Sequence, residues 1–582
     1  MQQKQDVKRL SIIGTACLGG LALALAACTA PTHGADVSPA DTAEPQSALG
    51  AYLAARHAQQ DHDFGNASRY MDHVLAGDPD NSDLVRRTFV LRVSEGRIDE
   101  ALPLAKRIVD LDRTAGLAQM VLMLRDVRAG DYNAAMGRVK AMTGDGAQRL
   151  AVPLLTAWCD MGLGQPDPAV KALGEMGDLR GVQTLQDLHR AMLADLADRL
   201  DDAEAAYKKV TAEPARLTWR TVELAGNFYE RHQRSEEARR LYQRLAAGEQ
   251  GGEVVEQALA RIDKGEVPAR IIASARDGIA ESLFDLASVL DQRETQDASL
   301  IYARMALDLR PGFPLAQMLV AEIDESEHRV AEALDIYNSI DRQSPLAWTA
   351  RLRAASALDR LDRTDEAIAD LKRMAEERPK EPTPLVEQGD ILRGRNRFSE
   401  AAAAYDAAIA RVDMSEKRQW RLFYSRGVAL ERAGQWPRAE ADLQRALALQ
   451  PEQPLVLNYL GYSWIDRGVH LDEALKMIQR AVDLRPNDGY IVDSLGWAYY
   501  RLSDVGNATK LLERAIELLP EDPTINDHLG DAYWQAGRAA EARFQWHRAL
   551  QFKPDADQVK VIETKLDRGI AKLPAPASAR GG

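Results

Sequence analysis

Residues 488–520, DGYIVDSLGWAYYRLSDVGNATKLLERAIELLP, carry a spacing of small residues that decides the fold. Gly496 follows a leucine, and Ala508 comes twelve residues after it. The same leucine–glycine pair recurs at Gly461 and Gly530, 35 residues before and 34 residues after Gly496. A period of this length is typical of proteins that stack many copies of one small structural unit.

Each position in the unit has a physical reason. The glycine lets the two helices of one unit approach closely, and the alanine leaves room for a neighbouring helix. Proline cannot donate the hydrogen bond that continues a helix, so Pro486, Pro520 and Pro554 close successive units. We expect about fourteen helix–turn–helix repeats. The alanines that mark them are Ala67, Ala101, Ala135, Ala169, Ala203, Ala238, Ala333, Ala367, Ala401, Ala439, Ala474, Ala508 and Ala542.

This spacing resembles the tetratricopeptide repeat, whose period is 34 residues. The resemblance implies an all-α fold, a tetratricopeptide-repeat right-handed superhelical solenoid in which the first helix of each repeat lines the concave side. Residues 246–279 escape the period and begin with a glycine-rich stretch, so we expect two arrays. The predicted domains are an N-terminal array over 48–247, an irregular hinge segment over 248–279, a C-terminal array over 280–565 and a disordered tail over 566–582.

The N-terminus has the composition of an export signal. Basic residues precede an apolar run that is too short to span a membrane as a helix. The run ends in LAAC (residues 25–28), which resembles the lipobox of bacterial lipoproteins, and this resemblance implies cleavage before Cys28 and a lipid on its thiol. We therefore predict a lipoprotein signal peptide over 1–27 and a flexible tether over 28–47.

The residue after the predicted lipid site favours one membrane. Thr29 stands where an aspartate would retain such a lipoprotein at the inner membrane. We expect the bacterial cell envelope, with the protein on the periplasmic face of the outer membrane and the lipid as its only membrane attachment. Cys17 is a competing lipid site, but Gly14 occupies the place where the lipobox has leucine. An uncleaved anchor and ordinary secretion stay open as alternatives.

Composition and motifs argue against several function classes. The formal charge of −14 argues against nucleic acid as a partner, because phosphate binding needs clustered cations. The repeats leave no room for a catalytic domain, and the sequence contains no nucleotide-binding, zinc or serine-hydrolase motif. We expect no enzyme activity, no metal and no cofactor. His528 and His547 lack metal-ligand spacing and are predicted to be surface or groove histidines, whereas Cys159 lies in an apolar stretch and is predicted to be a small buried hydrophobic residue.

The concave side of the C-terminal array is the candidate binding surface. The inward positions of the first helices combine aromatic rings with Asn, Asp and Arg, which suits an extended peptide or a protein surface. Some of these rings are equally expected to pack against the next repeat. The candidate residues are Arg393, Tyr424, Arg432, Asn458, Tyr462, Asp466, Tyr490, Asp493, Trp497, Tyr500, Arg501, Asp527, Asp531 and Trp534.

One mode of peptide binding is not expected. Some repeats of this fold hold a terminal carboxylate with lysine and asparagine at inward positions. Here Asp493, Asp527 and Asp531 occupy such positions, and their charge would repel a carboxylate.

Three phrases are more specific than the general repeat: LNYLGYSWIDRG (457–468), DGYIVDSLGWAYYRL (488–502) and INDHLGDAYWQAGR (525–538). They resemble bacterial envelope tetratricopeptide lipoproteins, similar to outer-membrane adaptors of carboxyl-terminal processing proteases. The resemblance implies a scaffold that presents substrates, such as cell-wall hydrolases, to a periplasmic protease. The C-terminal groove and the N-terminal array would then hold different proteins and raise their effective concentration. The alternative is a structural component of envelope assembly, in polysaccharide export or outer-membrane protein insertion.

Overall fold

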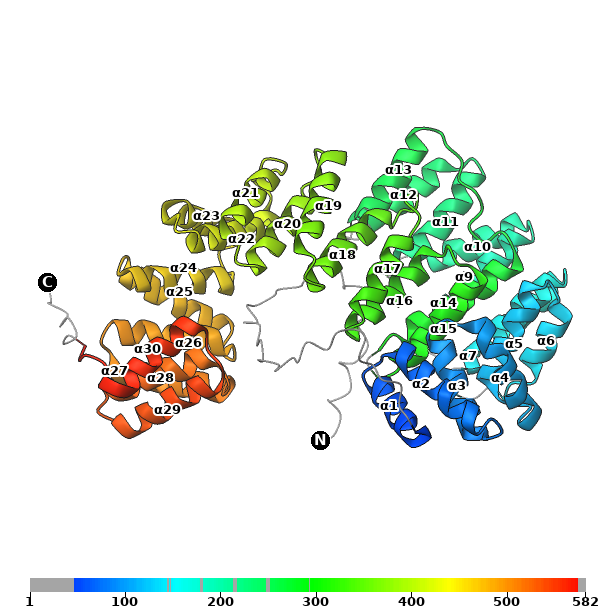
Figure 1. Cartoon of the computed structure of the whole chain (residues 1–582). Helices are drawn as coiled ribbons and strands as arrows, with labels where there is room; N and C mark the ends of the chain where they lie inside the picture. Colours follow the sequence, from blue (N-terminus) through cyan, green and yellow to red (C-terminus); the bar gives the residue numbers. More distant parts are fainter. Residues whose placement is uncertain are drawn as a thin grey trace, which may run out of the picture. The chain divides into compact units, whose positions relative to one another are not determined.

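The computed structural model describes residues 47–573, apart from gaps at 144–145, 147, 178–181, 213–216, 248–251 and 293. The predicted signal peptide, Cys28 and the tether up to residue 46 lie outside the described residues. The described chain forms two compact units, residues 47–366 and residues 367–573. Each unit is a series of helices that follow one another in antiparallel pairs (Figure 1).

The first unit contains the helices α1 (Ala48–Gln60), α2 (Phe64–Gly77), α3 (Ser82–Ser94), α4 (Ile98–Leu111), α5 (Gly116–Arg128), α6 (Tyr132–Lys140), α7 (Gln148–Gly162), α8 (Pro166–Gly174), α9 (Val182–Leu196), α10 (Leu200–Val210), α11 (Trp219–Arg231), α12 (Ser235–Ala247), α13 (Gly252–Asp263), α14 (Ala275–Leu290), α15 (Gln296–Leu309), α16 (Pro314–Ser326), α17 (Val330–Ser339) and α18 (Ala347–Arg360). The boundary between the units falls within α19 (Thr364–Glu377).

The second unit contains α20 (Thr383–Gly394), α21 (Phe398–Ile409), a short 3-10 helix (Lys417–Gln419), α22 (Trp420–Arg432), α23 (Trp436–Leu449), α24 (Pro454–Arg467), α25 (Leu471–Leu484), α26 (Gly489–Arg501), α27 (Val505–Leu518), α28 (Pro523–Gln535), α29 (Ala539–Gln551) and α30 (Ala556–Arg568). Among the described residues the helices form fourteen pairs, with α13 and α30 outside them. The predicted all-α repeat architecture and its number of repeats are confirmed. In the part of the chain that is described, no helix is long and apolar enough to cross a membrane.

The small residues of the repeat act as predicted. A Cβ at Gly496 would lie 2.8 Å from Leu512 Cγ, and one at Gly530 would lie 2.5 Å from the Trp546 ring. All the alanines of the predicted series have 0% exposed surface. Close approach of the two helices in a repeat therefore depends on the absence of a side chain at one position and on a methyl group at the other.

A left-handed residue ends the first helix of most repeats. Asp198 (φ 54°), Gln233 (φ 59°) and Asn396 (φ 59°) stand where Gly96 and other repeats have glycine, again about 34 residues apart. This conformation breaks the helix so that the second helix can reverse direction. Side chains other than glycine adopt it at a cost of about 1 kcal/mol, which packing of the repeat offsets.

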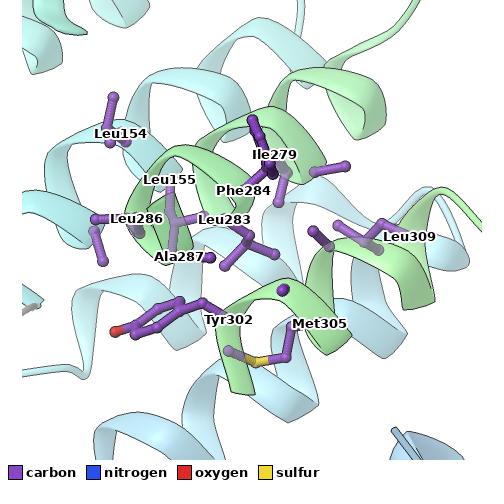
Figure 2. Close-up of a cluster of buried hydrophobic side chains, with 14 of the residues drawn as sticks. Leu154, Leu155, Ile279, Leu283, Phe284, Leu286, Ala287, Tyr302, Met305 and Leu309 are labelled. Atoms are coloured by element: carbon purple, nitrogen blue, oxygen red, sulfur yellow. The ribbon is translucent and has the colours of Figure 1, made fainter. Parts of the chain in front are cut away.

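The first unit closes on itself. Its helix α14 packs against α7 and α9, and α15 packs against α3 and α5, which are all first helices of earlier repeats. Figure 2 shows Leu155 of α7 beside Leu283 of α14, and Leu154 of α7, Ile279 of α14 and Met305 of α15 belong to the same cluster. Because first helices line the concave side of such an array, the pair α14–α15 occupies the concave side of the first unit.

Polar contacts reinforce this closure. The Arg220 Nε donates to Glu281 Oε1 at 2.6 Å, and Arg128 pairs with Asp308 at 3.0 Å. Where the first repeat meets α17, the Arg329 guanidinium donates to the His62 carbonyl at 2.6 Å. These contacts join residues up to 267 positions apart in the sequence, so the period alone does not reveal them.

The segment predicted as a hinge, 248–279, lies inside the first unit. Its helix α13 packs on α12, and the Asn227 side chain donates to the Ala269 carbonyl at 2.8 Å. Residues from Ala275 onward already belong to α14, which is held by α7. The compact units divide between Glu366 and Ala367 instead, because the contacts of α14 and α15 tie residues 280–366 to the N-terminal repeats.

Residues 566–573, the described part of the segment predicted as a disordered tail, make contacts with the last repeat. Helix α30 continues to Arg568, and Ile562 of this helix is 1% exposed. The main chain of residues 570–573 then bonds to α28. The proline-rich composition that suggested disorder begins only at Pro574.

Candidate functional site

The first helices of the second unit form a continuous face. Consecutive first helices contact one another in the pairs α20–α22, α24–α26 and α26–α28, so they lie on the inner side of the stack. Side chains from neighbouring first helices also meet on this side. Tyr424 and Tyr459 approach edge to face at 5.9 Å, and Asp493 faces His528 at 3.0 Å. We call this surface the A-helix face of the second unit.

An aromatic and ionic cluster occupies the face between α26 and α28. The Trp497 ring stacks on His528, with centroids 4.0 Å apart, and on Tyr500 at 4.7 Å. Burial lowers the pKa of His528, but the nearby carboxylates, chiefly that of Asp493, outweigh it and raise the pKa above its usual value. The structure thus brings the candidate residues Asp493, Trp497 and Tyr500 together, with Asp493 and Tyr500 buried.

The carboxylates on the first helix of the last repeat are neutralised by a lysine of the same chain. Lys565 Nζ of α30 lies 2.8 Å from carboxylate oxygens of both Asp527 and Asp531. The Trp546 indole N–H donates to Asp531 at 3.0 Å. Burial raises the pKa of Asp531, while the two carboxylates hold the pKa of Lys565 above its usual value despite burial. Asp527 and Asp531 therefore face the chain's own cation rather than an open groove.

Trp534 also contacts the chain's own C-terminal segment. Its indole N–H donates to the Ile570 carbonyl at 2.9 Å. The neighbouring Gln535 donates to the Ala571 carbonyl at 2.6 Å and accepts from the Leu573 N–H at 3.1 Å. Residues 570–573 therefore cover the α28 end of the A-helix face.

The middle of the face, on α24 and α26, is more open. Tyr490 is 42% exposed, and Tyr462 is partly exposed with its pKa raised to about 12, chiefly by burial. Asp466 pairs with Arg501 at 2.7 Å on the surface. Asn458 adds a polar group here: its Oδ1 is among the buried polar side-chain atoms of the described residues that have no hydrogen-bond partner.

The remaining predicted residues lie at the start of the face. Arg393 contacts Asp390 and the Tyr405 hydroxyl, each at 3.3 Å, so the Arg393 guanidinium has its partners within its own repeat. Tyr424 is partly exposed, and Arg432 is exposed with its guanidinium 5.2 Å from the Phe398 ring. These side chains form a surface of mixed aromatic and cationic character.

The two histidines and Cys159 differ in their exposure. His528 is buried within the A-helix face and His547 is exposed. Among the described residues there is no group of three or more His, Cys, Asp or Glu side chains that could hold a metal ion. Cys159 is fully buried, and burial raises the pKa of its thiol to about 12, which disfavours a reactive thiolate.

Sequence reasoning missed Lys565 and Gln535 as parts of this face. Lys565 lies outside the regular repeats, where the period assigns no position. Gln535 occupies the same position of its repeat as Arg501, which was predicted, so the periodic pattern contained a signal for Gln535. Together the contacts describe a surface of rings and polar groups that can hold a segment of protein.

A family model described as "Tetratricopeptide repeat" matches residues 321–382, 386–454, 424–489 and 494–557. The curated "TPR repeat-containing protein PA4667" of Pseudomonas aeruginosa is 27% identical over 194 residues. This match covers 33% of the chain and 32% of the relative, so the chain spans about a third of that relative's length.

Solved structures of repeat proteins are also similar. The APC/C hetero-tetramer Cut9–Hcn1 matches with 15% identity over 90% of this chain and 97% of that chain, with a TM-score of 0.37. A tetratricopeptide repeat protein from Parabacteroides merdae matches with 13% identity over 44% of this chain and 97% of its own, with a TM-score of 0.36. YrrB, described as a TPR protein with an unusual peptide-binding site, matches with 19% identity over 33% of this chain and 97% of that chain, with a TM-score of 0.26.

The matches at 386–454, 424–489 and 494–557 lie in the second unit, which carries the A-helix face, and the match at 321–382 begins in the first unit. The fourteen helix pairs of the described residues have the tetratricopeptide-repeat solenoid fold, and the chain is distantly similar to the TPR repeat-containing protein PA4667 of Pseudomonas aeruginosa.

Proposed function

We propose that the chain is a protein-binding scaffold whose partner contacts the A-helix face of the second unit, around α24 and α26. The observation that carries this proposal is the accessibility of three rings on α24 and α26: Tyr462 and Trp497 are partly exposed and Tyr490 is exposed, and the Asp466–Arg501 ion pair joins the same two helices. Aromatic rings with polar neighbours dominate the binding energy of protein interfaces. The face is continuous along consecutive first helices, which suits an extended segment of a partner.

The finer proposal is an envelope adaptor. The N-terminal sequence supports a lipid on Cys28 and a place on the periplasmic face of the outer membrane. Resemblance of the C-terminal repeats to lipoprotein adaptors supports a carboxyl-terminal processing protease as one partner and a cell-wall hydrolase as its substrate. On this proposal the scaffold raises the effective concentration of the two proteins for each other.

The first unit has a different part in this proposal. Its concave side is filled by α14 and α15, so a second partner would bind its outer surface rather than a groove. The expectation that the N-terminal array and the C-terminal groove hold different proteins stays a proposal.

Site-specific photo-crosslinking tests the binding face. A photoreactive phenylalanine replaces Tyr462 or Tyr490 in the chain in its native membranes, and Lys510, exposed on the second helix α27, serves as the matched control. Covalent capture of one protein from positions 462 and 490, but not from 510, supports the proposal. Equal capture from all three positions, or capture from 510 alone, contradicts it.

The identity of the captured protein tests the finer proposal. A processing protease or a cell-wall hydrolase supports the adaptor. A β-barrel assembly component or a polysaccharide synthase supports the alternative role in envelope assembly and removes the adaptor.

The lipid anchor is tested separately. Cys28→Ala removes the only thiol of the predicted lipobox, so the protein should move from the membrane fraction to the soluble periplasmic fraction. Retention of the Cys28→Ala variant in the membrane, with the same amount as the unchanged protein, would rule out lipid attachment at this residue as the anchor. Cys17→Ala is the control and should leave the protein in the membrane.

A further inference from the structure

The last repeat holds an extended piece of the chain itself. After α30, residues 569–573 return to α28, and their main chain makes three hydrogen bonds with two side chains of that helix. Trp534 donates to the carbonyl of Ile570, and Gln535 donates to the carbonyl of Ala571 and accepts from the N–H of Leu573. The contact is therefore made between side chains of the A-helix face and a peptide main chain.

Apolar contacts accompany these bonds. Ile570 and Leu573 pack against the apolar cluster that contains Trp534, whereas Lys572 between them is exposed. Gly569 has φ +69°, and a Cβ there would lie 2.0 Å from the Trp534 ring. The segment is thus recognised by its main chain, by two aliphatic side chains three residues apart, and by the absence of a side chain at its first position.

Helix α30 covers the end of the solenoid without this segment. Its Ile562 is buried in the core of the last repeat, and its Lys565 neutralises Asp527 and Asp531. Residues 569–573 add contacts that a separate peptide with the same groups could make equally well. Trp534 and Gln535 occupy the same positions of their repeat as Tyr500 and Arg501 do in the preceding repeat, where the face is not covered in this way.

We propose that the face of α28 around Trp534 and Gln535 is a binding site for an extended aliphatic peptide segment, and that the chain's own residues 569–573 occupy it and must be displaced by a ligand. Because the segment is tethered, its effective concentration at the site is on the order of millimolar, so it competes strongly even with weak individual contacts. The inference deepens the proposed function and rests on it for the identity of the competing ligand. That residues 569–573 occupy the site rests on their contacts with Trp534 and Gln535 and not on the proposed function.

A binding measurement tests the site directly. The probe is a synthetic peptide of residues 568–578, RGIAKLPAPAS, labelled at its C-terminus, and the receptors are the full chain and a chain that ends at Arg568. Fluorescence anisotropy should show binding to the shortened chain and at least about tenfold weaker binding to the full chain. Gln535→Ala in the shortened chain should weaken binding about tenfold, because it removes two hydrogen bonds.

Matched peptides control for non-specific binding. Gly569→Ala in the peptide should weaken binding, because its Cβ would collide with Trp534. Lys572→Ala should leave affinity unchanged within about twofold, because the Lys572 side chain is exposed. Equal affinity of the peptide for the full and shortened chains, or no binding to a shortened chain whose thermal unfolding matches that of the full chain, would overturn the proposal.

A second measurement uses the full chain alone. Hydrogen exchange of the Leu573 amide should be slow in the unchanged protein and fast in Gln535→Ala, with the exchange of α26 unchanged. Fast exchange of Leu573 in the unchanged protein would contradict occupancy of the site. If the peptide binds as expected but no protein is captured at positions 462 and 490, the peptide site on α28 is supported and the proposed scaffold function fails. The two proposals can therefore fail separately.

Discussion

At the scale of single residues, the smallest side chains determine the geometry of the repeat. The buried alanines and the glycines against the second helices were predictable, because steric fit leaves a fixed spacing in the sequence. The left-handed turn residues share that spacing, but their identities vary among glycine, Asp198, Gln233 and Asn396. A position that many residue types can occupy at small cost gives little signal in one sequence.

Substitution of Gly530 tests the close approach of two helices. Gly530→Ala places a methyl group 2.5 Å from the buried Trp546 ring, so the free energy of unfolding of the second unit should fall by about 2 kcal/mol. Gly506→Ala is the control, because its Cβ would meet only Asp504 Oδ1 at 3.8 Å. Urea denaturation followed by circular dichroism compares the two, and equal effects would contradict the steric account.

Buried His528 makes the stability of the second unit depend on pH. Its pKa is raised in the folded chain, so its stabilising contribution is complete below the unfolded pKa of about 6.5 and is lost as the pH rises through the folded value. Stability should therefore decrease from pH 6.5 upward, and His528→Gln should remove this decrease. Denaturation midpoints between pH 6 and pH 9 measure it. A midpoint that rises with pH in the unchanged protein but not in His528→Gln would show the opposite sign.

At the scale of helices, the periodic pattern predicted the pairs but not their long-range partners. Residues 275–309 have the same helical pattern as other repeats, so the sequence does not distinguish a pair that stacks on its neighbour from one that also fills the concave side. Whether the pair fills the concave side depends on residues far apart in the sequence, such as Leu155 beside Leu283 and Arg220 bonded to Glu281. The same limit applies to α30, whose Lys565 lies outside the regular repeats.

Truncation of a side chain in α14 tests its role as core. Leu283 is fully buried, so Leu283→Ala should destabilise the first unit by about 3 kcal/mol through lost apolar contact and a cavity. Leu111→Ala, at a leucine that is 69% exposed, should change stability by no more than about 0.5 kcal/mol. Thermal and urea unfolding measure both variants. A small effect of Leu283→Ala would mean that α14 does not belong to the core of this unit.

The docking of α30 depends on one lysine. Lys565→Ala leaves Asp527 and Asp531 without their cation, so the second unit should lose about 3 kcal/mol of stability. Lys560→Ala on the same helix removes an exposed pair with Asp557 and should have an effect near zero. Similar unfolding midpoints for the two variants would show that the buried pair contributes nothing to docking.

At the scale of the whole molecule, the period fixes a chain of repeats but not how much of the concave side stays open. The candidate residues were predictable as members of one face because equivalent positions of a repeat point the same way. Whether these residues are accessible to a partner was not predictable. Asp527, Asp531 and Trp534 are covered by α30 and residues 570–573. The central claim is that the concave side of the first unit is filled by its own helices, so that binding in a concave groove is proposed for the second unit alone.

A distance within the first unit tests this claim most directly. Spin labels at Asp61 and His328, exposed residues beside the contact of Arg329 with His62, report whether the first repeat meets α17. Cys17 and Cys28 are replaced by serine for this measurement, and Cys159 is buried. Pulsed electron paramagnetic resonance should give a short, narrow distance distribution. An open array with helices about 9 Å apart would separate the labels by several tens of ångströms, and a long, broad distribution would contradict the closed unit.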